Sequence, residues 1–378
     1  PAYLSNGTQV AANTPRFEQG RFGKAIMLEE GTTNLVNINN FTFDNGASLV
    51  DIVHPVTGKT VKAIKLPKGA NTPTAFSQYL SLSTNTNYTV SFDMWASDNS
   101  NAEINIDLYP DTLPQTSKTP TTNVQRHTWT LSSSNSDMGN CRLRFFDDTS
   151  QPMPNDVYIA MIQLEQKPYA TSFIDGTRAA ETLTIPTAGV LNPQEGTIEF
   201  WLNPYALSRN MYIGIGGTRY ASVTEDGNSY NIWYDAGYLL GAWGYGTGHY
   251  NVNTAFSAKN TWTAIAVTWK ANDSLKLFVS GALADSTSIG ALNPSFPYQK
   301  IFIGCTSLMD VQADGLIDDL RISSRARTDE EILAAYQSGQ PAPVDEWTTL
   351  KLNFSYFEWR YEFQSIYFLL SHEEYEIK

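Results

Sequence analysis

A stretch of aromatic residues and glycines between Tyr230 and Tyr250 holds the side chains best suited to bind a ligand. Flat aromatic rings can stack on sugar faces, and neighbouring polar groups can hydrogen-bond sugar hydroxyls. The same pattern is typical of a hairpin whose alternate rings fill a core while glycines relieve crowding. The stretch therefore predicts either a core-filling hairpin or a carbohydrate-binding one, and in the second case Trp243, Tyr245 and Tyr250 are expected to be the more exposed members. The candidate binding residues are Trp233, Tyr238, Trp243, Tyr245, His249 and Tyr250.

Groups suited to catalysis are sparse in the sequence. A glycosidase needs two carboxylates that flank the scissile bond, yet Glu199 stands alone on its predicted strand. Asp318 and Asp319 are adjacent, so their side chains are expected on opposite faces of a strand. The four histidines lie far from one another and from either cysteine, so no His–His or His–Cys pair has metal-ligand spacing. The sequence therefore predicts a protein that is not an enzyme.

The composition narrows the class of protein further. Of 378 residues, 42% are hydrophobic and 17% are charged, and the net charge is −13. This balance favours globular domains and argues against nucleic-acid binding, which needs a clustered basic face. The sequence holds no apolar run of about 18 residues, the length that suggests a membrane span. The two cysteines, Cys141 and Cys305, are expected to be unpaired and buried.

Short runs of β-branched and aromatic residues, bounded by Gly, Asn, Asp or Pro, predict an all-β protein. Ile198, Phe200 and Leu202 fall on one face of a predicted strand, and the segment 88–96 alternates in the same way. Regular spacing and turn-rich connectors favour jelly rolls over a helical or parallel architecture.

One helix is predicted near the C-terminal end of the second half. Thr328 can cap it, and Glu331, three residues later, completes a capping box. Gly339 is suited to end the helix, and the prolines that follow cannot continue it.

Four segments of the second half follow one another in a specific order: Gly196–Asn203, Trp262–Lys270, Leu275–Gly281 and Gly315–Ser323. Their residues and spacing resemble the laminin-G-like, concanavalin A-type jelly roll over roughly 190–340. The resemblance implies a two-sheet sandwich of a kind often used to bind carbohydrate or protein. We assign residues 178–340 to this domain.

Residues 31–175 are predicted to form the first sandwich. The opening segment Asn34–Val36 and the closing segment Val157–Glu165 resemble the carbohydrate-binding-module type of jelly roll. That resemblance implies a structural calcium ion held by oxygen ligands, although Met161 and Ile162 replace the usual aspartate pair. The alternative is that these carboxylates are solvated surface groups. The candidate calcium ligands are Glu30 and Glu165, with Asp318 at a further position on the rim of the second sandwich.

The string from Thr14 to Leu35 resembles a junction found in bacteriophage tail and other virion structural proteins. Residues 1–30 are therefore expected to form a connecting segment from a preceding domain. Residues 341–378 form an aromatic C-terminal extension, which is expected to contact a sheet edge or another subunit. The resemblance implies a tail, fibre or capsid-decoration protein, assembled in the host cytoplasm and exposed on the particle surface.

The sequence as a whole predicts two tandem antiparallel jelly-roll sandwiches followed by a short helix. We expect a non-enzymatic virion protein that binds host surface glycans and other virion proteins. We also expect a homo-oligomer, because linked sites raise avidity. A trimer is the favoured form, and neither nucleic-acid binding nor membrane insertion is expected. The alternative is a secreted bacterial glycan-binding module or an accessory domain of a glycoside hydrolase.

Overall fold

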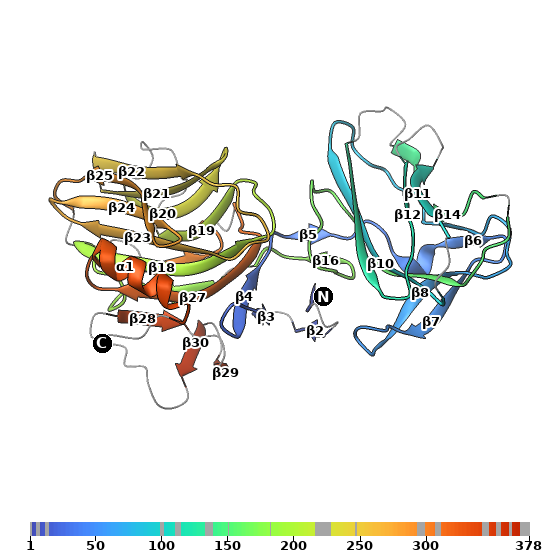
Figure 1. The fold of residues 1–378 in the computed structure, drawn as a ribbon, viewed down its shortest axis with the longest axis horizontal. Coiled ribbons are helices and arrows are strands. Elements are labelled where there is room, and N and C mark those ends of the chain that lie inside the picture. Colours follow the sequence, from blue (N-terminus) through green and yellow to red (C-terminus); the bar gives the residue numbers. More distant parts are fainter. Residues whose placement is uncertain are drawn as a thin grey trace. The chain divides into compact units, whose positions relative to one another are not determined.

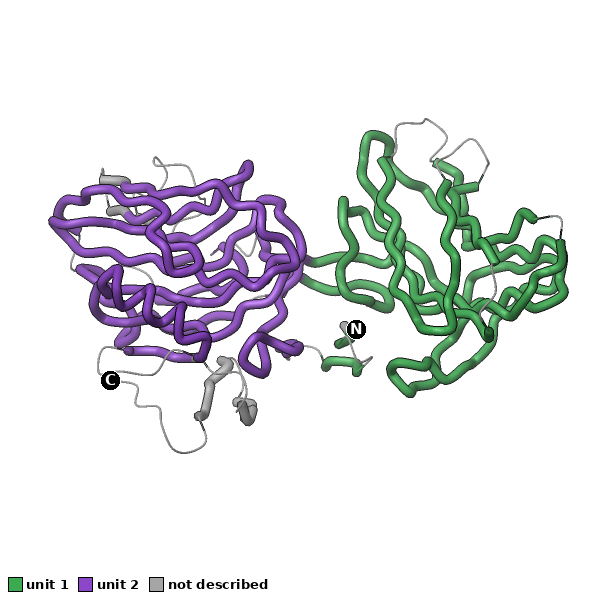
Figure 2. Tube along the Cα trace, in the orientation of Figure 1, with its two compact units in different colours: residues 1–14, 31–179 green, residues 15–30, 180–378 purple. Residues whose placement is uncertain are grey.

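The computed structural model describes most of the chain. It leaves out residues 1, 5–7, 12–14, 99–101, 110–114, 133–138, 150, 182, 216–227, 246–247, 293–298, 307–310, 342–347, 353–356, 363–364 and 371–378. The side chains of residues 2, 228–229, 244–249 and 352–378 are also outside the description. The chain divides into two compact units: residues 1–14 with 31–179, and residues 15–30 with 180–378 (Figure 2).

Unit 1 is a sandwich of two five-stranded antiparallel sheets (Figure 1). The first sheet has the order β13 (Gln125–Ser132), β10 (Asn87–Ala96), β15 (Val157–Glu165), β8 (Thr60–Leu66) and β7 (Ser48–Val53). The second has the order β12 (Gln115–Lys118), β11 (Ile104–Tyr109), β14 (Arg142–Phe146), β9 (Thr74–Phe76) and β6 (Thr42–Asp44). Shorter elements are η1 (Ile38–Asn40) and the pairs β1 (Ala2–Tyr3) with β2 (Gln9–Val10) and β5 (Thr32–Thr33) with β16 (Thr177–Arg178).

The core of unit 1 lies between its two sheets. Val90, Phe92 and Met94 of β10 pack there, as the alternation in the sequence predicts. Phe145 of β14 enters the same core from the second sheet and contacts Phe92 edge to face. Cys141 is buried and forms no disulfide, in agreement with the prediction.

Unit 2 is a larger sandwich of a six-stranded and an eight-stranded sheet. The six-stranded sheet has the order β17 (Leu183–Pro186), β26 (Lys300–Ile303), β19 (Asn210–Ile215), β20 (Asn228–Asp235), β21 (Tyr238–Tyr245) and β22 (Gly248–Ala255). The eight-stranded sheet contains β25 (Ala282–Ser288), β24 (Ser274–Val279), β23 (Thr263–Lys270), β18 (Glu195–Pro204), β27 (Gly315–Ser323), β4 (Lys24–Leu28) and β3 (Arg16–Gln19), with β28 (Thr348–Leu352) paired to β27. The strands β29 (Phe357–Glu362) and β30 (Ser365–Leu370) pair with each other.

Tight packing in the core of unit 2 favours glycine over any larger residue at one position of the predicted strand 196–203. A Cβ atom at Gly196 would lie 2.3 Å from the ring of Trp269, so a larger residue would force that ring to move. Ile198, Phe200 and Leu202 of the same strand fill the core, as predicted. The all-β, two-sandwich prediction is thus confirmed.

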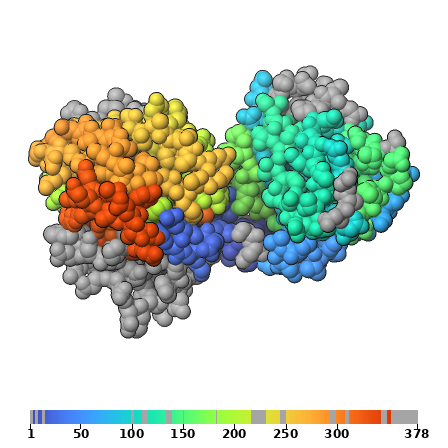
Figure 3. All heavy atoms as spheres, viewed as in Figure 1, coloured from blue at the N-terminus to red at the C-terminus, as the bar shows by residue number. Residues whose placement is uncertain are grey.

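Residues 15–30 differ from the expected connecting segment. Strand β4 pairs with β27, and β3 pairs with β4, so this segment extends the sheet of unit 2. Ile26 and Leu28 enter the core of that unit. Figure 3 shows the atoms of the segment, in blue, against the orange and red atoms of unit 2. The segment therefore belongs to a domain whose other residues follow 149 positions of unit 1, from 31 to 179.

A buried arginine bonds residues next to both positions at which the chain leaves and re-enters unit 2. Arg16 is 1% exposed and bonds both Glu29 and Glu181, with its Nε 2.6 Å from Oε1 of Glu181. The backbone amide of Glu29 also donates to Glu181, and that of Glu181 to the carbonyl of Glu29. Burial alone would lower the pKa of Arg16, but the two glutamates outweigh it and hold the pKa above its ordinary value.

The helix α1 (Asp329–Ser338) has the ends that the sequence predicts. Thr328 and Glu331 form a reciprocal capping box, and Gly339 ends the helix in the left-handed conformation at φ 61°. Ile332 faces the eight-stranded sheet and is buried against Ala266 and Phe278. No helix in the described part of the chain is long and apolar enough to cross a membrane.

Candidate carbohydrate-binding site

The aromatic stretch predicted to bind sugar forms β20, β21 and β22, and its rings divide between the two faces of the sheet. Trp243 is only 1% exposed and lies in the core, 4.3 Å from the ring of Trp269 and 4.7 Å from that of Tyr230. The expected exposure of Trp243 is therefore wrong. The reason is register: Trp243 stands opposite Tyr230 and Tyr250, on the inward side of the pleat.

The other members of this stretch do not form a common exposed platform in the described structure. Trp233 is on the outward side but is buried with Met211 and Ala242. Tyr250 is partly buried, and its hydroxyl accepts a hydrogen bond from the amide of Gly290. Tyr238 is 48% exposed. The side chains of Tyr245 and His249 lie outside the described residues.

The three predicted calcium ligands occupy separate settings. Glu165, in unit 1, accepts hydrogen bonds from the amide and hydroxyl of Thr171. Asp318, in unit 2, accepts from the amides of Phe22 and Asp319. Burial raises the pKa of Asp318, although these amides oppose the shift.

Glu30 completes the predicted set, and it is partly buried in unit 2. Its backbone amide donates to a carboxylate oxygen of Asp314. The described residues contain no group of three His, Cys, Asp or Glu side chains that could hold a metal ion. Calcium at any of these positions stays a prediction.

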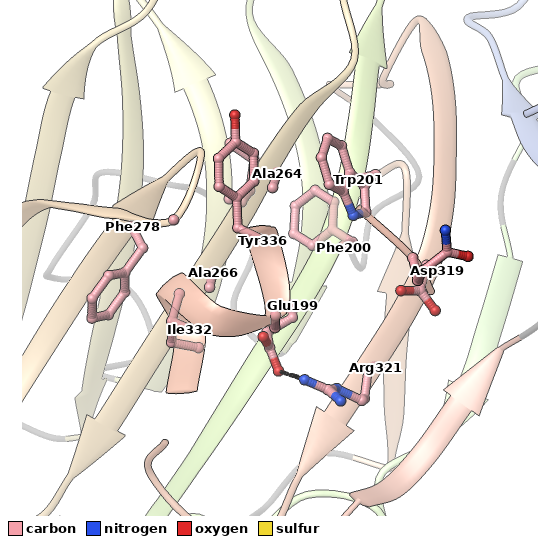
Figure 4. A pocket seen from close by; sticks show the side chains of 14 residues that line it. Glu199, Phe200, Trp201, Ala264, Ala266, Phe278, Asp319, Arg321, Ile332 and Tyr336 are labelled. Carbon is pink, nitrogen blue, oxygen red and sulfur yellow. Dashed lines mark hydrogen bonds and ion pairs between the residues drawn. The ribbon is translucent and has the colours of Figure 1, made fainter. Parts of the chain in front are cut away.

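A hollow of about 40 Å³ lies between α1 and the outward face of the eight-stranded sheet (Figure 4). Its volume suits a few water molecules, whereas pockets for small molecules measure several hundred Å³. Glu199 lines it, and its Oε2 receives Arg321 Nε at 3.1 Å and lies 3.3 Å from Arg327 Nε. A second ion pair joins Asp319 to Lys351 at 3.2 Å.

Aromatic and apolar contacts between α1 and the sheet border this hollow. Tyr336 of α1 stacks on Trp201 with ring centroids 5.8 Å apart, and Arg21 lies over Trp201 at 3.8 Å. Figure 4 shows Ile332 and Tyr336 projecting from α1 between the helix and the strands. We call this surface the helix-covered face, defined by Glu199, Trp201, Arg321, Ile332 and Tyr336. Its contacts hold α1 on the sheet.

A second group of aromatic and charged side chains lies on the outward face of β11, β14 and β9 in unit 1. Core residues alternate along these strands, so the side chains between them point away from the core. Two members are clearly exposed: Tyr79 at 65% and Tyr109 at 38%. We call this surface the aromatic–arginine face, defined by Phe76, Tyr79, Tyr109, Arg142, Arg144 and Phe146.

Arg144 lies at the centre of the aromatic–arginine face. Its guanidinium is 4.0 Å from the ring centroid of Phe146 and 4.9 Å from that of Tyr109. Both its Nε, at 3.0 Å, and its Nη2 bond the buried carboxylate of Asp107. This fork-shaped pairing fixes the guanidinium in one plane, so the rings around it are also held in place.

Arg142 extends the same face toward the exposed Tyr79. Its guanidinium lies 4.5 Å from the ring centroid of Phe76 and 5.2 Å from that of Tyr79. Its Nε donates to the carbonyl of Ser77 at 2.7 Å, and its Nη2 donates to the hydroxyl of Thr42. Such a surface can stack on sugar rings and donate hydrogen bonds to their oxygens.

The sequence prediction did not include the aromatic–arginine face. A signal was present: in Arg142-Leu-Arg-Phe-Phe146, Leu143 and Phe145 alternate with Arg142, Arg144 and Phe146. The meeting of this strand with Phe76 and Tyr109 depends on pairing across three strands that are distant in sequence. Local patterns do not encode that pairing.

Comparison with protein families supports the fold of unit 2. Residues 175–333 match the family described as the concanavalin A-like lectin/glucanases superfamily. Unit 2 has a laminin-G-like, concanavalin A-like lectin fold. This agrees with the resemblance drawn from its strands.

Solved structures similar to part of this chain include a binding domain of botulinum neurotoxin DC in complex with SialylT. It is 14% identical, with a TM-score of 0.33, over 45% of this chain and 41% of that one. Another is the native heptameric SAP-like pentraxin from Limulus polyphemus, at 11% identity and a TM-score of 0.34, over 43% of this chain and 77% of that one. The chain thus spans about two fifths of the neurotoxin domain. Comparison with curated proteins gave no match.

Proposed function

We propose that this protein is a non-enzymatic structural protein of a bacteriophage virion that binds glycans on the host surface. The observation that carries the binding part of the proposal is the aromatic–arginine face of unit 1. It combines exposed rings with guanidinium groups held flat beside them. The lectin-like fold of unit 2 is consistent with a role in recognition, although fold alone does not determine function.

The chemistry of the face suits a weak, repeated contact. Stacking of a sugar on an aromatic ring contributes on the order of 1 kcal/mol, so one face gives modest affinity. Display on an oligomer, for which we propose a trimer held among other virion proteins, would raise the avidity without any new contact. Exposed Tyr79 and Tyr109 are available for such contacts.

The proposal that the protein is not an enzyme is supported by how its carboxylates are used. The hollow in unit 2 contains Glu199, the residue whose position on a strand is most suggestive of a glycosidase acid. Its Oε2 is engaged by both Arg321 and Arg327. In unit 1, Asp107 is buried and bonded to Arg144. These oxygens bond arginines of the protein itself, which leaves them poorly placed to exchange protons with a substrate.

A glycan array that includes bacterial surface polysaccharides tests the proposal. The intact chain is compared with a Tyr79→Ala, Tyr109→Ala double variant, and with Leu283→Ala as a control that removes an exposed apolar side chain from unit 2. We expect binding by the intact chain and the control, and a loss of at least about tenfold in the double variant, since two stacking contacts are removed. Binding that survives in the double variant would place the site elsewhere, and no binding by the folded chain would contradict a glycan-binding role.

The virion assignment needs its own test. Mass spectrometry of purified phage particles from a lysate that expresses the chain should detect its peptides at a fixed ratio to a capsid protein. Recovery only in the soluble, particle-free fraction would instead favour a secreted glycan-binding module.

A further inference from the structure

We propose that the aromatic–arginine face selects sugars that carry a carboxylate, with Arg142 as the group that binds the acid and Tyr79 as the ring beside it. This inference rests on the proposed glycan-binding function and names the class of glycan. It is carried by a difference between the two arginines of the face.

The first observation is that, among the described residues, a carboxylate partner is found for only one of the two arginines. Arg144 is bonded through Nε and Nη2 to Asp107, so its charge is compensated within the protein. Arg142 has no carboxylate partner among the residues that the structure describes; its bonds go to the neutral oxygens of Ser77 and Thr42. The described residues of the face therefore leave the positive charge of Arg142 uncompensated.

The second observation is that the free donors of Arg142 are already oriented. A guanidinium carries five N–H donors in a fixed fork. In Arg142, one from Nε and one from Nη2 are used by Ser77 and Thr42, which leaves Nη1 without a partner in the described structure. Because these two bonds and the Phe76 ring hold the plane of the group, little side-chain entropy would be lost when Nη1 binds an anion.

The third observation is the position of Tyr79. Its ring centroid lies 5.2 Å from the guanidinium of Arg142, and its side chain is 65% exposed. A sugar ring that stacks on Tyr79 would bring a carboxylate substituent within reach of Nη1. Arginine favours carboxylates because its planar fork matches their two oxygens. Sugars with a carboxylate on the ring, such as uronic acids, fit this pair of contacts.

The net negative charge of the protein should restrict the binding of acidic glycans to the local positive charge of Arg142. The net charge of −13 disfavours general attraction of acidic polymers. At physiological salt that repulsion is screened beyond about 8 Å, so a close contact with Arg142 can still form. Acidic glycans would thus bind at this face rather than across the surface.

The test compares each acidic polysaccharide with its own carboxyl-reduced form. The probes are polygalacturonate, hyaluronan, alginate and polysialic acid, intact and reduced, with dextran as a neutral glycan and a phosphate-rich teichoic acid as a second anion. We expect at least one intact acidic polymer to bind about tenfold or more tightly than its reduced form. Added salt should weaken the binding of the intact polymer but not the binding of its reduced form.

Variants of Arg142 separate charge from geometry. Arg142→Gln should abolish the preference for the intact polymer, and Arg142→Lys should keep only part of it, because lysine lacks the fork. Arg209→Gln, which makes the same charge change at an exposed arginine of unit 2, should leave the preference unchanged. Circular dichroism of each variant checks its fold.

Each contrary outcome is informative. Equal binding of intact and reduced polymers, binding of dextran alone, or a preference that survives in Arg142→Gln would overturn the inference while the glycan-binding function stands. Stronger binding of teichoic acid than of any carboxylated polymer would overturn it in favour of a phosphate ligand. Absence of binding to every polymer, on the array as well, would overturn both.

Discussion

The helix-covered face of unit 2 and the aromatic–arginine face of unit 1 are built from similar parts. Each places an arginine over an aromatic ring: Arg21 lies 3.8 Å from Trp201, and Arg144 lies 4.0 Å from Phe146. Each also pairs an arginine with a carboxylate, through Arg321 with Glu199 and through Arg144 with Asp107. The two faces differ in their cover, because α1 packs on the first through Ile332 and Tyr336.

This difference shows that composition alone does not decide whether a sheet face is covered or left exposed. Under α1, Trp201 is buried, and its ring contacts Tyr336 and Arg21. On the aromatic–arginine face, which we also call the open face, Tyr79 and Tyr109 remain exposed. The same arginine–aromatic chemistry thus stabilises a helix in one unit and is left available for a partner in the other. Variants on the two faces should therefore differ in whether they affect folding or binding.

The largest expected effect is the loss of an arginine from the covered face. Arg321→Ala removes the hydrogen bond to Glu199 at a largely buried site, although Arg327 still contacts that carboxylate. We expect the free energy of unfolding of unit 2 to fall by about 3 kcal/mol. Calorimetry measures the fall, and hydrogen exchange of β18 and β10 assigns it to a unit.

The matched change on the open face is Arg142→Ala. Among the described residues, no carboxylate loses a partner there, so we expect a loss of less than about 1 kcal/mol. Equal costs for the two arginines would contradict the distinction between a covered and an open face.

A smaller effect is expected when the cover itself is loosened. Ile332→Ala removes a side chain buried against Ala266 and Phe278, and a deletion of this kind costs about 2 kcal/mol or more in a closed core. Amide hydrogen exchange of α1 should become faster while that of β10 is unchanged. Leu333→Ala, at the adjacent exposed position, is the control and should have little effect. Equal exchange rates in the two variants would mean that α1 does not depend on this contact.

Much of this architecture could be predicted from local sequence patterns. Alternation identifies the inward residues of β10 and β18, and the Thr328, Glu331 and Gly339 signals give both ends of α1. These features depend on neighbours two to four positions apart, which a sequence displays directly. The pairing of β4 with β27, almost 300 positions away, leaves no comparable local signal.

The sites were harder to predict than the fold for a physical reason. Trp243 and Trp233 lie on opposite sides of the sheet, yet nothing in the stretch 230–250 states which side faces the second sheet. A one-residue change of register would exchange them. A Trp243→Ala variant, attractive as a binding test from sequence, would instead empty part of the core. The open face of unit 1 likewise depends on what covers a sheet, which is a property of the whole fold.

The stability of α1 should also respond to pH. Arg325 and the capping amide of Thr328 lower the pKa of Glu331 to about 2, against burial, which opposes the shift. A depressed folded pKa means that the charged form stabilises the native state above the ordinary glutamate pKa of 4.5, and that this stabilisation is lost as pH falls from there toward 2.

Glu331→Gln measures this contribution. The side chain is 36% exposed, so solvent screening limits the effect to about 1 kcal/mol. We expect the difference in melting temperature between the wild type and Glu331→Gln to be largest near neutral pH and to shrink between pH 4.5 and pH 2. A difference that stays constant over this range would show that the charge of Glu331 does not stabilise α1.

The smallest effect on stability is expected on the open face, at Tyr79. Tyr79→Ala removes a side chain that is mostly in water, so the free energy of unfolding should change by less than about 0.5 kcal/mol. Tyr336→Ala, its counterpart in α1, removes a ring stacked on Trp201 and packed on Gly281, and should cost about 1 kcal/mol. Glycan binding should respond in the reverse order, with a loss in Tyr79→Ala and none in Tyr336→Ala. Because stability and affinity are measured separately on the same two proteins, a shared order in both would mean that binding follows folding stability and not contact with Tyr79, and the open face would then have no special role.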